Sequence, residues 1–384
     1  MKIAVLGYGT VGAGVYSMLS DVPGMEAGPV LVRPGKAVES FMVSDAALIF
    51  GDPTVDAVVE TLGGLDPAYS YGMRALEAGK HFITANKAMV ASHGLELAAL
   101  AREKGAAFLF SAACGGGVPF LHNLALSAET DRIEAVSGIL NGTTNYMLDA
   151  MQRRSLSYGD ALREAQSLGY AESDPTADVS GLDALRKMQL ACAVAFGVLP
   201  QSGMLCEGME HFTAADVEDI QSRGLVCRLL ARGSRAGESV SAYVEPVLFP
   251  RAAPESSVFT NNNMARYTGK RCGSIVLMGQ GAGRFPTASA VLRDLSAAQQ
   301  GARSMFPENC RAAEADNREA VHSYYIRTGG FAAVRLPLRS VLAQGEVVRA
   351  VTEPMSAEKM HALAQNIRKD GNDLFFAALE EELC

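Results

Sequence analysis

The first third of the chain alternates short apolar runs, rich in β-branched residues, with segments whose apolar residues recur at helical spacing. The expected strands are Lys2–Leu6, Val30–Arg33, Val55–Glu60, His81–Ala85 and Phe108–Phe110. The expected helices are Val11–Leu19, Pro67–Ala78, Ser92–Lys104 and Pro119–Ala128. This alternation predicts an α/β fold in which helices cover both faces of a parallel sheet.

The pattern changes after about residue 130 and predicts an α+β middle region. The expected strands there are Arg132–Ile139, Ser239–Leu248 and Gly273–Met278, and the expected helices are Asn145–Arg154, Gly159–Leu168 and Gly181–Phe196. From about Ala312 the chain turns polar. It then resumes with HSYYIRTGGFAAVRL and EVVRAVTEPMSAEKMHALAQNIRK, and the second piece predicts a strand followed by a helix. These pieces indicate a small third module.

Composition limits the kinds of protein this can be. The 384 residues, 48% of them hydrophobic and 20% charged, can form two or three domains with sizeable cores. A net charge of −8 argues against nucleic acid or an anionic membrane as partner. The seven cysteines form no CxxC pair, which indicates reduced thiols. With no signal peptide and no apolar run near 18 residues, we expect a cytoplasmic protein.

The first expected strand leads into a glycine loop, IAVLGYGTVGAGV, with Gly7, Gly9 and Gly12 at GxGxxG spacing. Such glycines permit a tight turn and close approach to a pyrophosphate, which the following helix N-terminus attracts. A purely structural turn is the alternative. Arg33 and Lys36 follow the second expected strand, where an acid would bind the ribose of NAD. A cation there suits the 2′-phosphate of NADP, although a solvated loop arginine would look the same.

Two further segments follow expected strands of the first region. Asn86 and Lys87 lie just after a strand, at the edge where open α/β sheets bind ligands, although such a lysine is often plain surface charge. In SAACGGGVPF, three glycines fit a backbone-only pocket or a hinge. Cys114 in this segment raises the alternative of a thiol nucleophile, but only His122 on the next helix could serve it as a base.

The segment GILNGTTNYML ends a strand at Asn141 and Gly142 and begins a helix at Thr143 and Thr144. Free N–H groups and a hydroxyl at such a helix start could bind a small anionic or carbonyl-bearing ligand. Ordinary N-capping by threonine is compatible with that reading.

Asp183 and Lys187 lie four residues apart on a helix that is apolar around most of its circumference. Upstream are three more acids, Glu172, Asp174 and Asp178. One interpretation is a buried ion pair that holds two elements together. The other is a site in which a desolvated lysine moves a proton, as oxidation of an alcohol requires. No histidine lies in the segment that holds these acids and Lys187, so a lysine is the available base there.

Taken in order, the motifs resemble those of homoserine dehydrogenases along residues 1 to about 300. The matching stretches are GxGxVG at 7–12, VDAVVETLGG, ALEAGKHFITANKA, GGGVP, GILNGTTNYML, LGYAESDPTADVSGLDALRK and GQGAGRFPTASAV. The resemblance implies an NADP-dependent enzyme, with NAD possible, that interconverts L-homoserine and L-aspartate 4-semialdehyde for threonine and methionine synthesis. It also implies a small-molecule substrate and a homodimer.

The resemblance assigns roles to individual residues. Lys187 corresponds to the proton-transfer lysine, Asp183 to its neighbour at the substrate oxygen, and Glu172 to the ligand of the substrate ammonium. The remaining substrate positions are Asp178, Tyr170, Lys87, Gly142 and Thr143. The implied coenzyme positions are Gly7, Gly9, Thr10, Val11, Gly12, Arg33, Thr61, Gly63, Lys87, Gly169 and Gly283.

The chain departs from the family at two places. Ser111 stands where many relatives have a glutamate that helps hold a monovalent cation, and Cys114 replaces the usual valine. The carbonyls of Cys114, Gly116 and Val118 could still ligate sodium. The last residues are also too few for a complete regulatory ACT domain, so we expect a truncated ACT-like module whose middle is missing.

The expected domains are a Rossmann-type dinucleotide-binding domain at 1–130, completed by part of 279–305, a catalytic and dimerisation domain at 131–300, and the short module at 318–384. Two other functions remain as alternatives. One is a thiol-dependent semialdehyde dehydrogenase, and the other is a non-catalytic NAD(P)-binding sensor, which should lack an intact proton-transfer pair.

Overall fold

The computed structural model describes residues 1–333 and 335–380, and it contains two compact units. The first unit comprises Met1–Ile133, Gln189–Leu199 and Gly269–Arg311. The second comprises Glu134–Met188, Pro200–Thr268 and Ala312–Cys384. Within the described residues, no helix is both long and apolar enough to cross a membrane.

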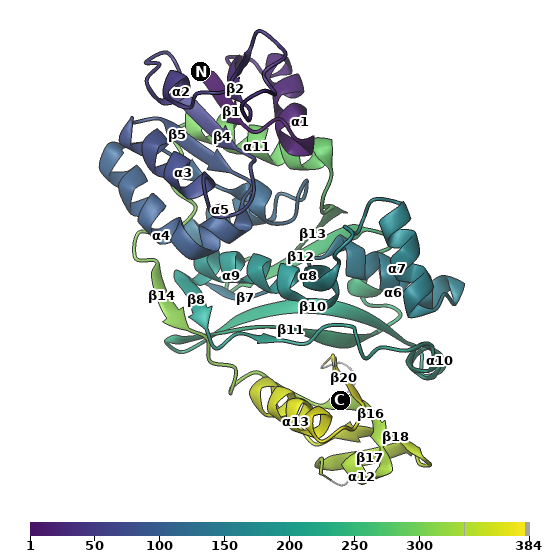
Figure 1. The fold of residues 1–384 in the computed structure, drawn as a ribbon. Helices are drawn as coiled ribbons and strands as arrows, with labels where there is room; N and C mark the ends of the chain where they lie inside the picture. The colour runs from purple at the N-terminus through teal and green to yellow at the C-terminus, as the bar shows by residue number, and fades with distance from the viewer. Residues whose placement is uncertain (334, 381–384) are drawn as a thin grey trace. The chain divides into compact units, whose positions relative to one another are not determined.

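The first unit is built on a six-stranded sheet with the order β3-β2-β1-β4-β5-β6 (Figure 1). Its strands are β1 (Lys2–Leu6), β2 (Glu26–Leu31), β3 (Met42–Val43), β4 (Ala57–Glu60), β5 (His81–Thr84) and β6 (Phe108–Leu109), and neighbouring strands run parallel. This is the doubly wound order of dinucleotide-binding folds. The central strands read as continuous apolar runs because helices bury both faces of the sheet, and Ile3 to Leu6 are 0% exposed.

Helices cover this sheet in two packed pairs, α3 (Ala68–Glu77) with α4 (Lys87–Lys104), and α1 (Thr10–Met18) with α11 (Arg284–Gln299) (Figure 1). The other elements of the first unit are η1 (Leu19–Asp21), α2 (Ala47–Phe50), η2 (Ser111–Ala113), α5 (Phe120–Thr130) and β13 (Gly273–Gln280). Several expected boundaries differ from the structure, and two of them bear on the site. Strand β2 ends at Leu31, so Arg33 lies in the following turn. Helix α4 begins at Lys87 rather than Ser92, because the Asn86 side chain caps it by accepting a hydrogen bond from Met89 N.

The middle of the second unit is an antiparallel sheet that was only half predicted. Its neighbouring strands are β12 (Asn262–Gly269), β7 (Ile133–Ile139), β10 (Leu225–Ala236) and β11 (Ser239–Pro250). Strands β10 and β12 were missed, although β10 pairs with β11 over its whole length. The helices here are α6 (Gly142–Arg154), α7 (Tyr158–Ser167), α8 (Thr176–Val179), α9 (Leu182–Phe196) and α10 (Ala214–Ser222). Shorter elements are β8 (Val198–Ser202), β9 (Leu205–Cys206), η3 (Pro254–Ser257), β14 (Arg311–Glu314), β15 (Val321–His322) and β19 (Met355–Ser356).

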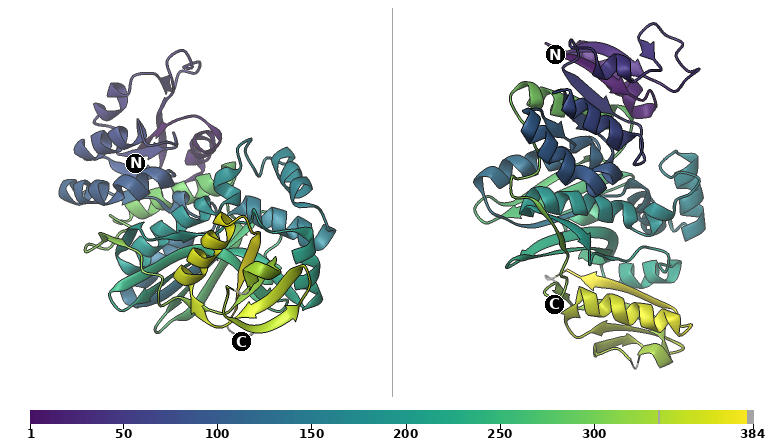
Figure 2. Two further views of the ribbon diagram at one scale, coloured as in Figure 1. Left: turned by 60° about the horizontal axis from the view of Figure 1, so that its bottom comes forward. Right: turned by 60° about the vertical axis from the view of Figure 1, so that its left-hand side comes forward.

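The expectation that the C-terminal module lacks its middle was wrong. The module contains β16 (Tyr324–Gly329), α12 (Gly330–Ala333), β17 (Leu338–Ala343), β18 (Val347–Thr352), α13 (Ala357–Lys369) and β20 (Leu374–Leu379). Its strand order is β20-β16-β18-β17, which is a βαββαβ arrangement whose first helix is four residues long. Figure 2 shows α13 lying along this sheet.

The module shares its core with the middle sheet. Strand β20 pairs in parallel with β11, for example Val247 with Ala378. Buried residues of both parts, such as Phe249 and Phe376, form one apolar cluster. The Arg368 guanidinium also donates two hydrogen bonds to the Glu207 carboxylate, at 2.6 and 2.9 Å. The module is therefore integrated into the second unit by packing, pairing and charge.

Candidate active site

The glycine loop of the first unit forms a tight turn between β1 and α1. Gly7 has φ +97°, which favours glycine. A Cβ on Gly12 would lie 2.1 Å from the Gly7 carbonyl oxygen, so only glycine fits at that position. Gly9 is the N-cap of α1 and offers no side chain to the first helical N–H groups, which begin with Thr10 and Val11. A helix start without a side-chain cap is suited to a phosphate.

The loop after β4 forms the neighbouring wall and depends on a residue that sequence reasoning missed. Glu60 is 0% exposed, and its carboxylate accepts hydrogen bonds from Leu62 N at 2.6 Å and Thr84 Oγ1 at 2.6 Å. Burial raises the pKa of this carboxyl group. Thr61 is fixed to β1, because its Oγ1 donates to Leu6 O at 3.0 Å. The available signal was the acid that ends the apolar run AVVE.

A cleft of about 1110 Å³ lies between these loops. Of the predicted coenzyme residues, those lining it are Gly7, Gly9, Arg33, Thr61 and Gly63. Lys36 lines it as well, and its N–H donates to Arg33 O at 3.0 Å, which closes a turn that carries both cations. The shape and donor set fit a dinucleotide, with a helix start for the pyrophosphate and cations at the far end.

The remaining predicted residues of the first unit lie at two helix starts. Lys87 is the first residue of α4, where its charge opposes the helix dipole. Asn86 also donates to Gly64 O at 2.6 Å and so ties this helix start to the loop after β4. Gly283 is the N-cap of α11 with φ +124°.

The glycine-rich segment of the first unit packs tightly around Gly116, where a Cβ would lie 2.4 Å from Gly281 O. Cys114 is 0% exposed, so its thiol does not present an accessible nucleophile in this structure. Ser111 Oγ donates to Asp294 Oδ1 at 2.5 Å, and Ser111 N donates to Oδ2 at 2.7 Å. Burial raises the pKa of Asp294 to about 7. A carboxyl group from α11 therefore lies beside the serine that departs from the family pattern.

The second unit brings together the predicted lysine and two of the acids. Lys187 Nζ lies 2.7 Å from Asp183 Oδ2 and donates to Leu140 O at 2.6 Å. The side chains of Lys187 and Asp183 are 12% and 10% exposed. The carbonyl comes from the end of β7, so the lysine is held between its own helix and the strand end.

Asn141 connects the acids, a role that the sequence reading did not assign to it. Its Nδ2 donates to Asp178 Oδ1 at 2.7 Å and to Asp183 Oδ2 at 2.9 Å. Its Oδ1 accepts from Thr144 N at 2.8 Å, so Asn141 caps α6, and the expectation of a threonine cap was wrong. The pKa of Asp178 is raised, chiefly by burial and also by the Asp183 charge, while Asn141 and Lys187 act in the opposite direction.

The other predicted substrate residues surround this cluster or lie in the adjacent loop. Thr143 Oγ1 donates to Tyr170 O at 2.6 Å, and a Cβ on Gly142 would lie 2.8 Å from Asn261 O. Gly169 has φ +75° just after α7, as is typical of a residue that ends a helix. Glu172 lies exposed in the loop that follows. In the described part of the chain, no group of three His, Cys, Asp or Glu side chains could hold a metal ion.

A doubly wound sheet, an uncapped glycine loop beside a dinucleotide-sized cleft, and a buried acid–lysine pair define a nicotinamide-dependent dehydrogenase. The family model for homoserine dehydrogenase matches residues 119–296, and that for the homoserine dehydrogenase NAD binding domain matches residues 7–111. The homoserine dehydrogenase of Synechocystis sp. is 38% identical over 319 residues, which cover 77% of this chain and 72% of that protein.

Two further similarities agree with these matches. The homoserine dehydrogenase of Corynebacterium glutamicum is 38% identical over 314 residues, covering 76% of this chain and 70% of that protein. The crystal structure of a homoserine dehydrogenase from Thiobacillus denitrificans has a TM-score of 0.87 at 29% identity, covering 99% of this chain and 98% of the other. The chain belongs to the homoserine dehydrogenase family.

The enzyme is thus an NAD(P)-dependent oxidoreductase that interconverts L-homoserine and L-aspartate 4-semialdehyde in amino-acid biosynthesis. The family matches do not favour the thiol-dependent dehydrogenase, and the buried thiol of Cys114 agrees with them. The non-catalytic sensor is not favoured either, since the acid–lysine pair is intact.

Proposed function

We propose that Lys187 is the proton-transfer residue of homoserine oxidation and that Asp183 positions it. The supporting observation is the Lys187 ammonium group held between Asp183 Oδ2 and Leu140 O, with both side chains largely buried. Two fixed acceptors restrict the direction of the amine, as a proton donor or acceptor requires. Asn141 supports this geometry because its amide nitrogen donates to both the Asp178 and the Asp183 carboxylates and so fixes their positions.

The chain's own residues account for the proton movements. When bound, the coenzyme supplies the hydride acceptor or donor at its nicotinamide C4. In the oxidation direction, the neutral Lys187 amine accepts the hydroxyl proton of homoserine while the carbinol carbon loses its hydride. In the reduction direction, the Lys187 ammonium returns that proton to the carbonyl oxygen. Asp183 stabilises the ammonium form in both directions.

The amino-acid part of the substrate is assigned to the loop and helix start beside this pair. We infer that Glu172 binds the substrate ammonium, because it is an exposed carboxylate in the loop next to Tyr170. Asp178, Tyr170, Gly142 and Thr143 complete the binding residues. Lys87, at the start of α4, is assigned to substrate and coenzyme.

We assign the coenzyme preference to NADP because of two cations that line the coenzyme cleft. Arg33 and Lys36 line the same turn, and two cations suit a 2′-phosphate better than the diol of NAD. The contacts assigned to the coenzyme come from Gly7, Gly9, Thr10, Val11, Gly12, Arg33, Thr61, Gly63, Lys87, Gly169 and Gly283.

Other assignments rest on the family resemblance. They are a cytoplasmic location, a homodimer and a sodium ion on the carbonyls of Cys114, Gly116 and Val118. We also assign the C-terminal module to the ACT type, since its βαββαβ order suits that fold even though α12 is a single turn.

The proposal is tested by comparing Asp183→Asn with the wild type in homoserine oxidation. The amide retains the shape and an acceptor for Asn141 but removes the charge beside Lys187. We expect kcat to fall at least tenfold, while the dissociation constant for NADP⁺ changes little. A variant that keeps more than about half of the wild-type kcat would remove Asp183 from the mechanism.

A further inference from the structure

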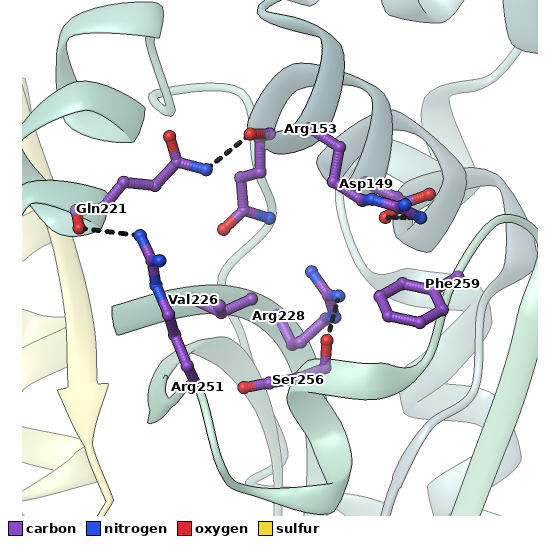
Figure 3. Close-up of a pocket in the computed structure, with 9 residues that line it drawn as sticks. Asp149, Arg153, Gln221, Val226, Arg228, Arg251, Ser256 and Phe259 are labelled. Carbon is purple, nitrogen blue, oxygen red and sulfur yellow. Dashed lines mark hydrogen bonds and ion pairs between the residues drawn. The ribbon is translucent and has the colours of Figure 1, made fainter. Parts of the chain in front are cut away.

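Figure 3 shows another pocket, lined by residues of the second unit. It lies at the opposite end of α6 from Asn141. Asp149 and Arg153 are on the last turns of α6, Arg228 is near the start of β10, and Arg251 follows β11. At 1.5 Å per residue, Arg153 lies about 18 Å along the helix from Asn141. The pocket is therefore distinct from the proposed substrate site.

The pocket is positively charged, whereas the chain as a whole is negatively charged. Three arginines and one aspartate line it, which gives a net charge of two positive units in a chain of net charge −8. Arg228 is 2% exposed, and its guanidinium donates to four backbone carbonyls, those of Cys227, Glu255, Ser256 and Val258, at 3.1–3.2 Å. These carbonyls orient the buried cation but carry no full negative charge to neutralise it.

The single acid leaves most of this charge uncompensated. Asp149 Oδ1 lies 3.9 Å from Arg153 Nη1. The other carboxylate oxygen, Asp149 Oδ2, accepts a hydrogen bond from Thr260 N at 3.1 Å. Figure 3 shows Arg228 between Arg251 on one side and Arg153 on the other.

Arg153 and Arg251, the two arginines on either side of Arg228, are positioned by contacts that leave N–H donors available. The Arg153 guanidinium lies 4.5 Å from the centre of the Phe259 ring, which fixes its position by a cation–π contact. Among the described residues, the Arg251 guanidinium donates one hydrogen bond, to Gln221 O at 3.2 Å. A guanidinium has five N–H donors. Within the described part of the chain, neither Arg153 nor Arg251 uses all of them, so both can donate to a ligand.

We propose that this pocket binds a small doubly charged oxyanion of the phosphate class, either inorganic phosphate or the phosphate group of a small metabolite. A phosphate monoester carries about 1.5–2 negative charges at pH 7 and inorganic phosphate somewhat fewer, which approaches the two uncompensated positive charges. Planar guanidinium groups bind its oxygens in pairs. The volume of about 280 Å³ is small for a ligand pocket, so it suits a phosphate rather than a nucleotide. Neither homoserine nor aspartate semialdehyde carries phosphate, so this ligand is additional to the reaction.

The test is calorimetric titration of inorganic phosphate into enzyme saturated with NADP⁺, at constant ionic strength. Saturation with coenzyme blocks the phosphate-binding glycine loop, so the remaining binding reports on this pocket. We expect saturable binding that Arg251→Gln and Arg153→Gln each weaken at least tenfold, since each removes a charge-assisted contact. Arg339→Gln, which changes an exposed arginine on β17, is the matched control and should bind as the wild type does.

Two further ligands identify the source of the anion. Tighter binding of glycerol 3-phosphate than of inorganic phosphate supports a phosphorylated metabolite, and the reverse order supports free phosphate. Malonate, a dianion without phosphate, should bind more weakly than both. The proposal is overturned by an absence of saturable phosphate binding, by tighter binding of malonate, or by unchanged affinity in folded Arg251→Gln and Arg153→Gln proteins. Because the readout is binding, it does not depend on Lys187 or on turnover.

Discussion

Replacing Lys187 by alanine separates its proposed chemical role from its structural one. The substitution deletes an ammonium group that lies 2.7 Å from Asp183 Oδ2, in a pair of side chains 12% and 10% exposed. Breaking such a buried pair typically costs about 3–5 kcal/mol of unfolding free energy. Asp183 retains its hydrogen bond from Asn141, so we expect a loss near 3 kcal/mol. The loss of proton transfer should lower kcat by roughly 10²–10⁴.

The assay is the steady-state rate of homoserine oxidation by Lys187→Ala, with and without n-propylamine, which replaces the deleted atoms. We expect the amine to restore part of the rate in proportion to its concentration, with NADP⁺ affinity nearly unchanged. Lys80→Ala is the control, because Lys80 is also buried, at 5% exposed, but its ammonium group donates, among the residues that the structure describes, to the backbone carbonyls of Asp52 and Val55. This control should lose stability without amine rescue. A Lys187→Ala enzyme with more than about half of the wild-type kcat, or equal rescue of both variants, would refute the reasoning.

Three further outcomes are expected. Glu172→Gln should raise the KM for homoserine at least tenfold by removing a charged contact. Asp174→Asn should leave this KM nearly unchanged, because the Asp174 carboxylate accepts a hydrogen bond from Thr176 Oγ1. Equal KM changes in the two variants would contradict the ammonium assignment. Arg33→Asp should shift the kcat/KM preference from NADP towards NAD by about tenfold, or roughly 1.4 kcal/mol. An unchanged preference would show that Arg33 does not contact the 2′-phosphate. Burial raises the pKa of Asp294 from 3.8 to about 7, so the folded chain keeps a proton that the unfolded chain releases. Its unfolding free energy should therefore fall by up to roughly 4 kcal/mol as the pH rises from about 4 to about 7. Urea titrations of Asp294→Asn should show less of this fall, and identical pH dependence would contradict it.

The sheet of the first unit was predictable because its strands are buried on both faces. Continuous apolar runs such as Ile3 to Leu6 result from that burial, and helical segments separate them regularly. Strand β10 was not predictable in the same way. Its arginines interrupt the apolar pattern, and their partners are distant in sequence, such as Glu380 for Arg232 at 2.6 Å. A local pattern cannot show that such charges are satisfied within a sheet.

The same distinction applies to the candidate site. Asp183 and Lys187 were found together because helical spacing places them on one face. The contribution of Asn141 was missed because it lies 42 residues before Asp183, and only the fold brings them together. Asp294 was missed for the same reason, since it lies 183 residues from Ser111. Residue type and spacing therefore predicted the acid–lysine pair that we propose as the reacting groups, while the contacts that position the pair required the structure.

The central claim is that this chain reduces L-aspartate 4-semialdehyde by hydride and proton transfer, without a thiol intermediate. The most direct measurement is the rate of NADPH oxidation by the purified enzyme with that aldehyde, in phosphate-free buffer, before and after treatment with iodoacetamide. We predict that NADPH is consumed, that homoserine forms in equal amount, and that the treated enzyme keeps its activity. Absence of NADPH oxidation, or activity that iodoacetamide abolishes, would contradict the account.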